Sequence, residues 1–159
     1  MNLQEQQVMA DLIRNQRWAA LATQGPEGPE ASWVAYVPEA DFSGFLLHLS
    51  TLGSHTRNLL ANPRAGLAIS EPERAGEDPQ TLGRVMIQGL VAIIPKDSRN
   101  YLEMSRRYQE QLPGSTPRFE FGDFLLLRLT PARIRFVGGF ARAYTLDDTA
   151  LRSAAQRTS

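Results

Sequence analysis

The segment 49–58 gathers the side chains best suited to chemistry in this chain. Hydroxyl, imidazole and guanidinium groups follow one another closely there, at Ser50, Thr51, Ser54, His55, Thr56 and Arg57. The pattern predicts a strand end, a polar loop and a helix start, with Ser54 as the N-cap. Free backbone N–H groups at a helix N-terminus stabilise an anion, hydroxyls donate to phosphate oxygens, and Arg57 offers a bidentate charged contact. The segment therefore predicts a phosphate site.

A purely structural interpretation of the same segment stays open. Ser and Thr are common at helix N-termini for reasons of capping alone. In that case Ser54 only caps the helix, and His55 and Arg57 face water.

Arg84 and Gln88 mark a second candidate region. Both belong to the apolar run 84–94, and residues four apart on a strand share a face. A buried Gln needs a hydrogen-bond partner, which a ligand can provide. The alternative is that Arg84 is a solvated surface residue and Gln88 points to solvent. Trp33 likewise either flanks a planar ligand or packs in the core.

The elements that position these residues form a meander of strands. An amphipathic helix is expected over 3–13, and further helices over 54–61 and from Asp97 or Ser98 to about Gln111. Strands are expected over 18–23, 31–37, 45–49, 65–70, 84–94, 124–129 and 134–137, with an exposed loop over 71–83. Gly89 is expected at a bulge or a close approach, and Thr130-Pro131 at a bend between the last two strands.

Strands that follow one another without intervening helices favour an antiparallel barrel over a doubly wound sheet. The expected fold is mainly β (α+β), a six- to seven-stranded antiparallel split barrel with flanking helices. Residues 1–146 are expected to form this one domain, and 147–159 a C-terminal tail.

Composition excludes several classes of function. The 159 residues hold 17 basic and 17 acidic side chains, so no global charge favours nucleic acid or a membrane surface. No window is apolar enough to span a bilayer or to act as a signal peptide, which predicts a cytoplasmic protein. The absence of Cys removes disulfides and thiolate chemistry, and the two histidines show no zinc-ligand spacing. No acid–base pair can be assigned, which favours a cofactor that carries the chemistry itself.

Several segments in order resemble the pyridoxamine 5′-phosphate oxidase-like, FMN-binding split-barrel superfamily. They are Trp18-Ala-Ala-Leu-Ala-Thr23, Glu30-Ala-Ser-Trp-Val34, the segment 49–59, and Asn62-Pro-Arg-Ala-Gly-Leu67. The runs His55-Thr-Arg-Asn-Leu59, Arg84-Val-Met-Ile-Gln-Gly89 and Val137-Gly-Gly-Phe-Ala-Arg-Ala143 are similar to the haem-utilisation branch of that superfamily.

The resemblance implies a homodimer with FMN at the subunit interface. It implies that the loop from Ser50 to Arg57 holds the FMN phosphate and that Ser32, Trp33 and Val34 run along the flavin ring. It also implies that the strand of Arg84 and Gln88 reaches the cofactor of the other subunit. The expected function is that of a flavin-dependent oxidoreductase, with a small-molecule substrate or an electron donor such as a reduced nicotinamide.

Three departures from the resemblance keep other functions open. His55 stands where many FMN-binding members have Lys, and Ser54 where the oxidases often have Arg. No His follows His55 to ligate haem as in some members of the haem-utilisation branch. The alternatives are a non-catalytic flavin- or haem-binding protein or sensor, and a dimeric barrel without a cofactor.

Overall fold

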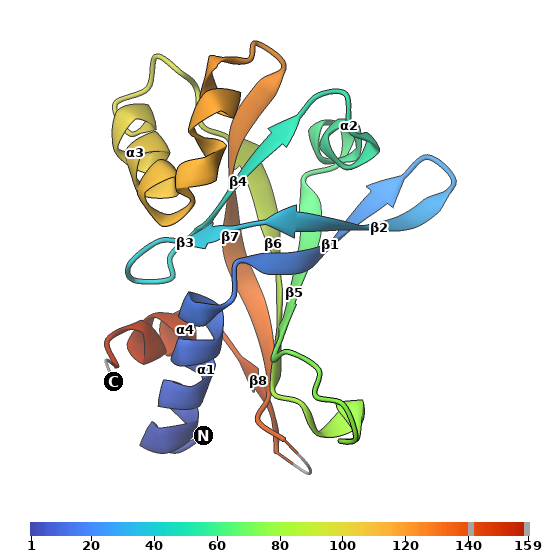
Figure 1. Ribbon diagram of the computed structural model, residues 1–159, viewed down its shortest axis with the longest axis vertical. Coiled ribbons are helices and arrows are strands. Elements are labelled where there is room, and N and C mark those ends of the chain that lie inside the picture. Colours follow the sequence, from blue (N-terminus) through green and yellow to red (C-terminus); the bar gives the residue numbers. More distant parts are fainter. Residues whose placement is uncertain (140–141, 158–159) are drawn as a thin grey trace.

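One antiparallel sheet forms the centre of the molecule and curls into a half-barrel (Figure 1). The structure is a computed structural model and describes residues 1–139 and 142–157. Seven strands lie in the order β2-β1-β5-β6-β7-β4-β3, and β8 pairs with β7. Their bounds are β1 (Trp18–Gly25), β2 (Gly28–Ala35), β3 (Val37–Pro38), β4 (Phe45–Ser50), β5 (Arg64–Ser70), β6 (Arg84–Ile93), β7 (Phe124–Val137) and β8 (Ala143–Leu146). The expected split-barrel class is confirmed.

Helices cover both ends of the half-barrel. At one end, α1 (Leu3–Asn15) lies beside α4 (Asp148–Ala155), near both termini (Figure 1). At the other end, α3 (Tyr101–Gln111) packs on the 3₁₀ segment η2 (Pro113–Glu120). The helix α2 (Ser54–Ala61) sits over β1 and β2, and the short η1 (Pro79–Thr81) precedes β6.

Tyr36 joins the two edge strands of the sheet, because β2 ends before it and β3 begins after it. Its backbone N–H donates to the Arg17 carbonyl at 3.2 Å, and its hydroxyl donates to the Ile13 carbonyl at 2.8 Å. The chain therefore crosses from one edge of the sheet to the other under the end of α1. The main core fills the concave side, with α1 and α4 against it.

Gly89 confirms the expected bulge. The register between β6 and β7 shifts between Gln88 and Gly89. A Cβ atom at Gly89 would lie 2.0 Å from the backbone oxygen of Thr130, so only glycine allows this approach. The expected bend at Thr130-Pro131 does not divide the last strand, since β7 continues through it as one strand.

Several element boundaries differ from those expected. Gly53, not Ser54, is the N-cap of α2, and it makes no side-chain capping bond. The third helix begins at Tyr101, because Ser98 is held in a turn by bonds from its N–H and hydroxyl to the Pro95 carbonyl. The sequence pattern missed η2 and β8. The expected tail contains α4, whose Leu151 is fully buried.

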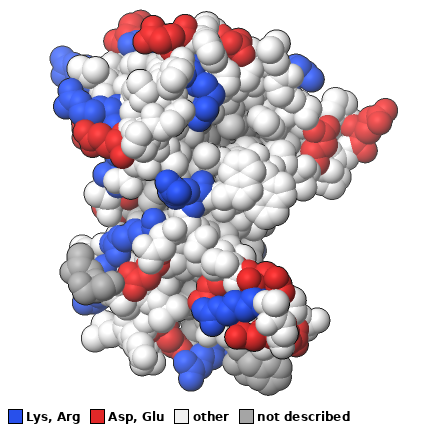
Figure 2. Space-filling view, in the orientation of Figure 1, with Lys and Arg blue, Asp and Glu red and all other residues white. Residues whose placement is uncertain are grey.

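Charged side chains of both signs are scattered over the surface in Figure 2, without a large area of one sign. Among the described residues, no helix is both long and apolar enough to cross a membrane.

Candidate ligand-binding site

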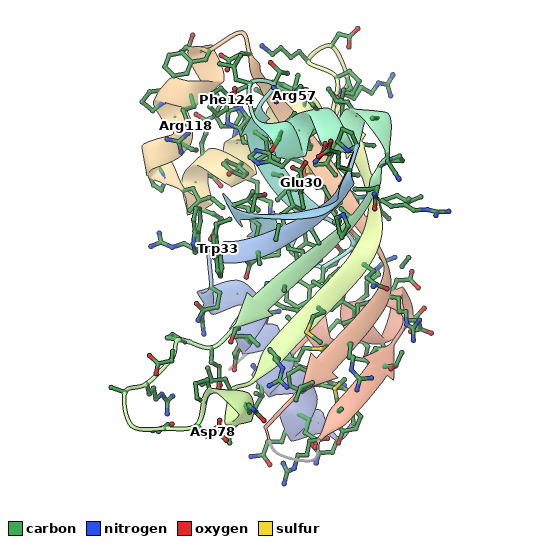
Figure 3. All side chains as sticks on the ribbon, turned by 90° about the vertical axis from the view of Figure 1, so that its right-hand side faces the viewer. Glu30, Trp33, Arg57, Asp78, Arg118 and Phe124 are labelled. Carbon is green, nitrogen blue, oxygen red and sulfur yellow. The ribbon has the colours of Figure 1, made fainter. Side chains whose placement is uncertain are left out.

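Small residues occupy the middle of the sheet face that points away from the core. The register aligns Met86 on β6 with Ala68, Ala20 and finally Trp33 on β2. A neighbouring row aligns Gln88 with Gly66, Ala22 and Ala31. Residues paired directly across antiparallel strands point to the same face. Figure 3 looks towards this part of the sheet, with Trp33 labelled on β2.

A cleft of about 620 Å³ lies in this face, within the range of small-molecule sites. Its floor is close to the backbone, because Ala22, Gly66, Gly89 and Ala132 have little or no side chain. Apart from Ala65, the remaining lining residues are longer or polar, and they are Thr23, Gln24, Pro29, Asn62, Arg64, Gln88, Leu90 and Arg133. A floor of small residues with polar side chains around it suits a planar ligand.

Two arginines give the cleft its charge. The guanidinium groups of Arg64 and Arg133 form no ion pair or hydrogen bond with any residue that the structure describes. Gln88 is directly opposite Arg133 in the β6–β7 pair, and its side chain is exposed. Gln88 therefore faces the cleft and is not a buried amide. The cleft offers two cations and one amide to an anionic ligand.

The segment between β4 and α2 is largely bonded to the protein itself. The Ser50 hydroxyl donates to the Asp123 carboxylate and accepts from the Leu52 N–H. The Thr51 N–H donates to the Asp123 carbonyl at 2.8 Å, and the Arg57 guanidinium donates to the Leu52 carbonyl at 2.8 Å. A carboxylate stands beside the proposed phosphate loop, and a phosphate would meet its negative charge.

His55 and Thr56 lie at the start of α2 in different surroundings. Partial burial lowers the pKa of His55, and the nearby Glu30 carboxylate opposes this shift. Thr56 is fully buried, and its hydroxyl has no partner among the described residues. Ser54 is exposed. Because His55 is then mostly neutral near pH 7, the loop presents little positive charge beyond Arg57.

The β2 residues implied for the flavin ring point to opposite faces. Val34 is buried in the core, and the hydroxyl of Ser32 is buried with no hydrogen-bond partner among the described residues. Trp33 is 62% exposed on the outer face and stacks on Trp18, with centroids 6.0 Å apart and planes 8° apart. Alternation along a strand explains this separation.

Arg84 and Gln88 share the outer face, but only Gln88 lines the cleft. One guanidinium nitrogen of Arg84 donates at 3.0 Å to both the Gln80 and the Leu82 carbonyls, which holds Arg84 against η1. Sequence reasoning missed Arg64 and Arg133. Exposed arginines on strands carry no signal of their own, and only the pairing of β5, β6 and β7 brings them to one cleft.

This chain belongs to the family described as pyridoxamine 5′-phosphate oxidase, whose match covers residues 6–138. The resemblance of the sequence to this superfamily is thereby confirmed. Phe140 and Ala141, which form part of one of the resembling segments, lie outside the described residues.

Relatives within the family carry haem-related names. The chain is 28% identical over 129 residues to heme oxygenase HutZ of Vibrio cholerae, covering 78% of this chain and 70% of HutZ. It is 32% identical over 116 residues to the non-canonical heme oxygenase HOZ of Arabidopsis thaliana, covering 73% of this chain and 34% of HOZ. The structure of a heme binding protein from Mycobacterium smegmatis superposes with a TM-score of 0.82 at 26% identity, covering 94% of this chain and 60% of that one.

Proposed function

We propose that this protein binds haem or a closely related tetrapyrrole in the cleft on the outer face of the sheet. The observation that carries the proposal is the backbone-level floor of the cleft together with the guanidinium groups of Arg64 and Arg133, which pair with no residue that the structure describes. The haem-related names of its relatives support the same class of ligand. Haem binding thereby takes the place of the flavin-dependent oxidoreductase function that was expected from the sequence.

The residues of the cleft fit the ring and the acidic edge of such a ligand. The apolar ring would lie against Ala22, Gly66 and Gly89, where no long side chain prevents close approach. The propionate carboxylates would accept hydrogen bonds from Arg64 and Arg133. Bound haem would supply a redox-active iron, whose reactivity depends on an axial ligand.

The described residues that line the cleft provide no side chain that commonly ligates haem iron. Among the described residues that line it, none is His, Cys, Met or Tyr. His48 is buried among aromatic rings, and His55 lies on α2 beside Glu30. Recognition in this cleft therefore rests on the ring plane and the carboxylates, which favours a binding or sensing role over turnover.

A homodimer is part of the proposal. The outer face exposes Leu90 beside small residues that cannot shield one another from water. A second copy packed on this face closes the cleft and buries the ring. Light scattering on the purified protein tests this, with a mass of twice the 17.7 kDa chain expected. A monomeric mass with and without haem contradicts it.

The test of the function is a titration with haem followed by absorbance in the Soret region. We expect a saturable shift of the Soret band, with affinity reduced about 100-fold or more in the double variant Arg64→Ala/Arg133→Ala, since it removes two charged hydrogen bonds of about 1.5–3 kcal/mol each. Arg106→Ala is the matched control, because Arg106 is exposed on α3 away from the cleft. A protein that binds no haem, or a double variant that binds it as the control does, overturns the proposal.

FMN is the second candidate, favoured by the family to which the chain belongs. The same protein is mixed with FMN, desalted and scanned for the two-band flavin spectrum. If FMN is retained, Arg57→Ala should weaken its retention by about 1.5–3 kcal/mol, the size of a hydrogen bond to a charged group. Bleaching of bound FMN by a reduced nicotinamide would then separate an oxidoreductase from a carrier. Loss of all FMN on desalting removes this candidate.

A further inference from the structure

Two helical elements, α3 and η2, cover one end of the sheet and are called here the α3–η2 cap (residues 101–120). The chain enters the cap from β6 and leaves it into β7, and these two strands pair directly with each other. Figure 1 shows the cap at the end of the sheet opposite to α1 and α4. The cap is therefore one continuous insertion, which can leave the sheet without separating any pair of strands.

The cap rests on a small apolar cluster that is separate from the main core. Among the described residues, the two clusters share no member. The small cluster has the buried residues Val37, Leu46, Ile94, Tyr108 and Leu126, with Tyr101, Met104, Leu112 and Phe119 packed against them. Segments with few buried apolar contacts open at a lower free energy than the whole protein. Opening of the cap would therefore leave the core of the half-barrel intact.

His48 lies between the sheet and the cap. It is two residues from Leu46 on β4, so the two side chains share the face that the cap covers. The imidazole stacks on Phe119 of η2 with centroids 3.8 Å apart, and Tyr108 of α3 meets it edge-on at 5.7 Å. Phe124 at the start of β7 approaches to 5.1 Å. With the cap closed, His48 is only 7% exposed and is surrounded by aromatic rings.

The charges around His48 oppose its protonation while the cap is closed. Burial is the larger cause, followed by Arg118 on η2 and Lys96 after β6, and together they lower the pKa of His48 from 6.5 to about 4. Of the two carboxylates that precede β7, Glu120 is exposed and Asp123 accepts a hydrogen bond from a β4 hydroxyl. An imidazolium is therefore much more stable when the cap is open and water reaches it.

Polar contacts hold the cap to the sheet only sparsely. Arg107 donates to the Pro38 carbonyl at 2.9 and 2.7 Å, and the Tyr108 hydroxyl contacts the His48 backbone. Two buried polar atoms, Nδ1 of His48 and the hydroxyl of Ser115 on η2, have no hydrogen-bond partner among the described residues. Both atoms would gain water when the cap opens, which offsets part of the free energy of opening.

We propose that the α3–η2 cap is an acid-sensitive element, which opens as one unit when His48 is protonated while the half-barrel stays folded. Opening uncovers the apolar side of β3, β4 and β7 in mildly acidic surroundings, and closing hides it near pH 7. No cap residue lines the proposed haem cleft, so the inference does not rest on the proposed function.

Hydrogen exchange of the full-length protein, followed by mass spectrometry, tests the opening. After correction for intrinsic rates, amides of the cap should exchange about 30-fold faster at pH 5.0 than at pH 7.5, given pKa values of 6.5 for the open and about 4 for the closed state. At both pH values they should be protected at least about 10-fold less than amides of β5 and β6, since a local opening precedes global unfolding. Equal protection of cap and strands, or no acceleration in acid, overturns the proposal.

A variant of His48 separates its protonation from the packing of the cap. His48→Phe keeps an aromatic ring in the stack, so exchange of the cap should become nearly equal at the two pH values. His55→Gln is the matched control, because His55 lies on α2, and it should keep the ratio of the unaltered protein. Arg107→Gln loses the bonds to Pro38 and should accelerate exchange of the cap by a similar factor at both pH values. An unchanged ratio in His48→Phe overturns the proposal.

The pH profile of the unaltered protein keeps the test decisive if His48→Phe does not fold. Exchange of the cap, corrected as before, should be nearly constant from pH 8 to pH 7 and should rise about sevenfold between pH 6 and pH 5, as one imidazole requires. Opening driven by a carboxylate would rise only below about pH 5. A profile of that second kind overturns the role of His48.

Discussion

The ring of His48 lies flat against that of Phe119, with centroids 3.8 Å apart and planes 10° apart. His48 belongs to β4 and Phe119 to η2, so this contact fastens η2 over the end of the sheet. Tyr108 meets the imidazole edge-on at 5.7 Å. The Nδ1 atom of His48 is buried, and no residue that the structure describes is its hydrogen-bond partner. His48 therefore serves as an aromatic core residue in its neutral form.

Stability should depend on the protonation of His48. Burial, with the charges of Arg118 and Lys96, lowers the pKa of His48 from 6.5 to about 4. Between these values the unfolded chain binds the proton and the folded chain does not, so the free energy of unfolding falls as the pH falls from about 6.5 to about 4. Urea denaturation at several pH values measures this slope.

His48→Phe should keep the stacked cluster and remove most of that slope. Part of the slope should persist through His55, whose pKa burial also lowers, and near pH 4 through the Glu39 carboxylate, whose pKa is lowered by its hydrogen bonds. His55→Gln serves as the control and should remove only the smaller part. An unchanged slope in His48→Phe would show that His48 is protonated in the folded protein.

The ion pair of Glu39 and Arg128 should stabilise the turn between β3 and β4. Arg128 donates to both carboxylate oxygens at 2.7 Å, and Ser43 donates to the same carboxylate. Burial opposes ionisation of Glu39, but these bonds hold the pKa of Glu39 below its usual value. Glu39→Ala should lower the free energy of unfolding by about 1.5–3 kcal/mol, which is the range for a hydrogen bond to a charged group.

The comparison for this variant is the exposed pair of Arg74 and Glu77, 4.0 Å apart. Glu77→Ala should change stability by less than about 0.5 kcal/mol. Because the folded pKa of Glu39 is lowered, its contribution is present above the unfolded pKa and is lost as the pH falls through the folded one. Equal effects of the two variants near pH 7 would contradict the assignment.

Gly89→Ala should be among the most damaging single changes in the sheet. The new methyl group meets the Thr130 carbonyl, which is backbone and cannot rotate away. We expect a loss of about 1–3 kcal/mol or more from forced overpacking, measured by thermal unfolding. Gly114→Ala is the matched change into open space and should leave the melting temperature nearly unaltered. Similar melting temperatures for both variants would show that the bulge can shift.

Leu151→Ala tests whether α4 is part of the folded domain. Leu151 is fully buried in the main core, and the α4 helix packs on α1. Removing this side chain should cost about 2–5 kcal/mol of unfolding free energy. Thr149→Ala on the exposed side of α4 should be close to neutral. If Leu151→Ala also proves neutral, residues 147–159 behave as a tail.

Most strands were predictable because their residues alternate between apolar and polar types, or are wholly apolar, between clear turn residues. Gly89 was predictable as a bulge, since a glycine in a long apolar strand has few other uses. The N-cap at Gly53 was not, because Ser54 has the stronger intrinsic preference and the bonds of the preceding loop decided the geometry. The strand β8 has four residues and depends on pairing with β7.

The candidate site was only partly predictable. Gln88 was singled out and lines the cleft, but Arg64 and Arg133 were not. Their proximity depends on which strands are neighbours, and this information lies in pairings that sequence periodicity does not reveal. The hydroxyl of Ser50 was expected to face a ligand, but it is bonded to Asp123, which is 73 positions along the chain. Local patterns cannot anticipate such a partner.

The pairing of β4 with β7 has a consequence for synthesis of the chain. β4 is complete at Ser50, but its partner begins only at Phe124. At about 5–20 residues per second, the ribosome needs about 4–15 s to make the intervening chain. During that time the apolar strand 45–49 has no neighbour on the side where β7 will lie. The nascent chain is therefore most prone to aggregation in this interval. Chaperones that bind nascent chains would recognise the strand 45–49 during this time.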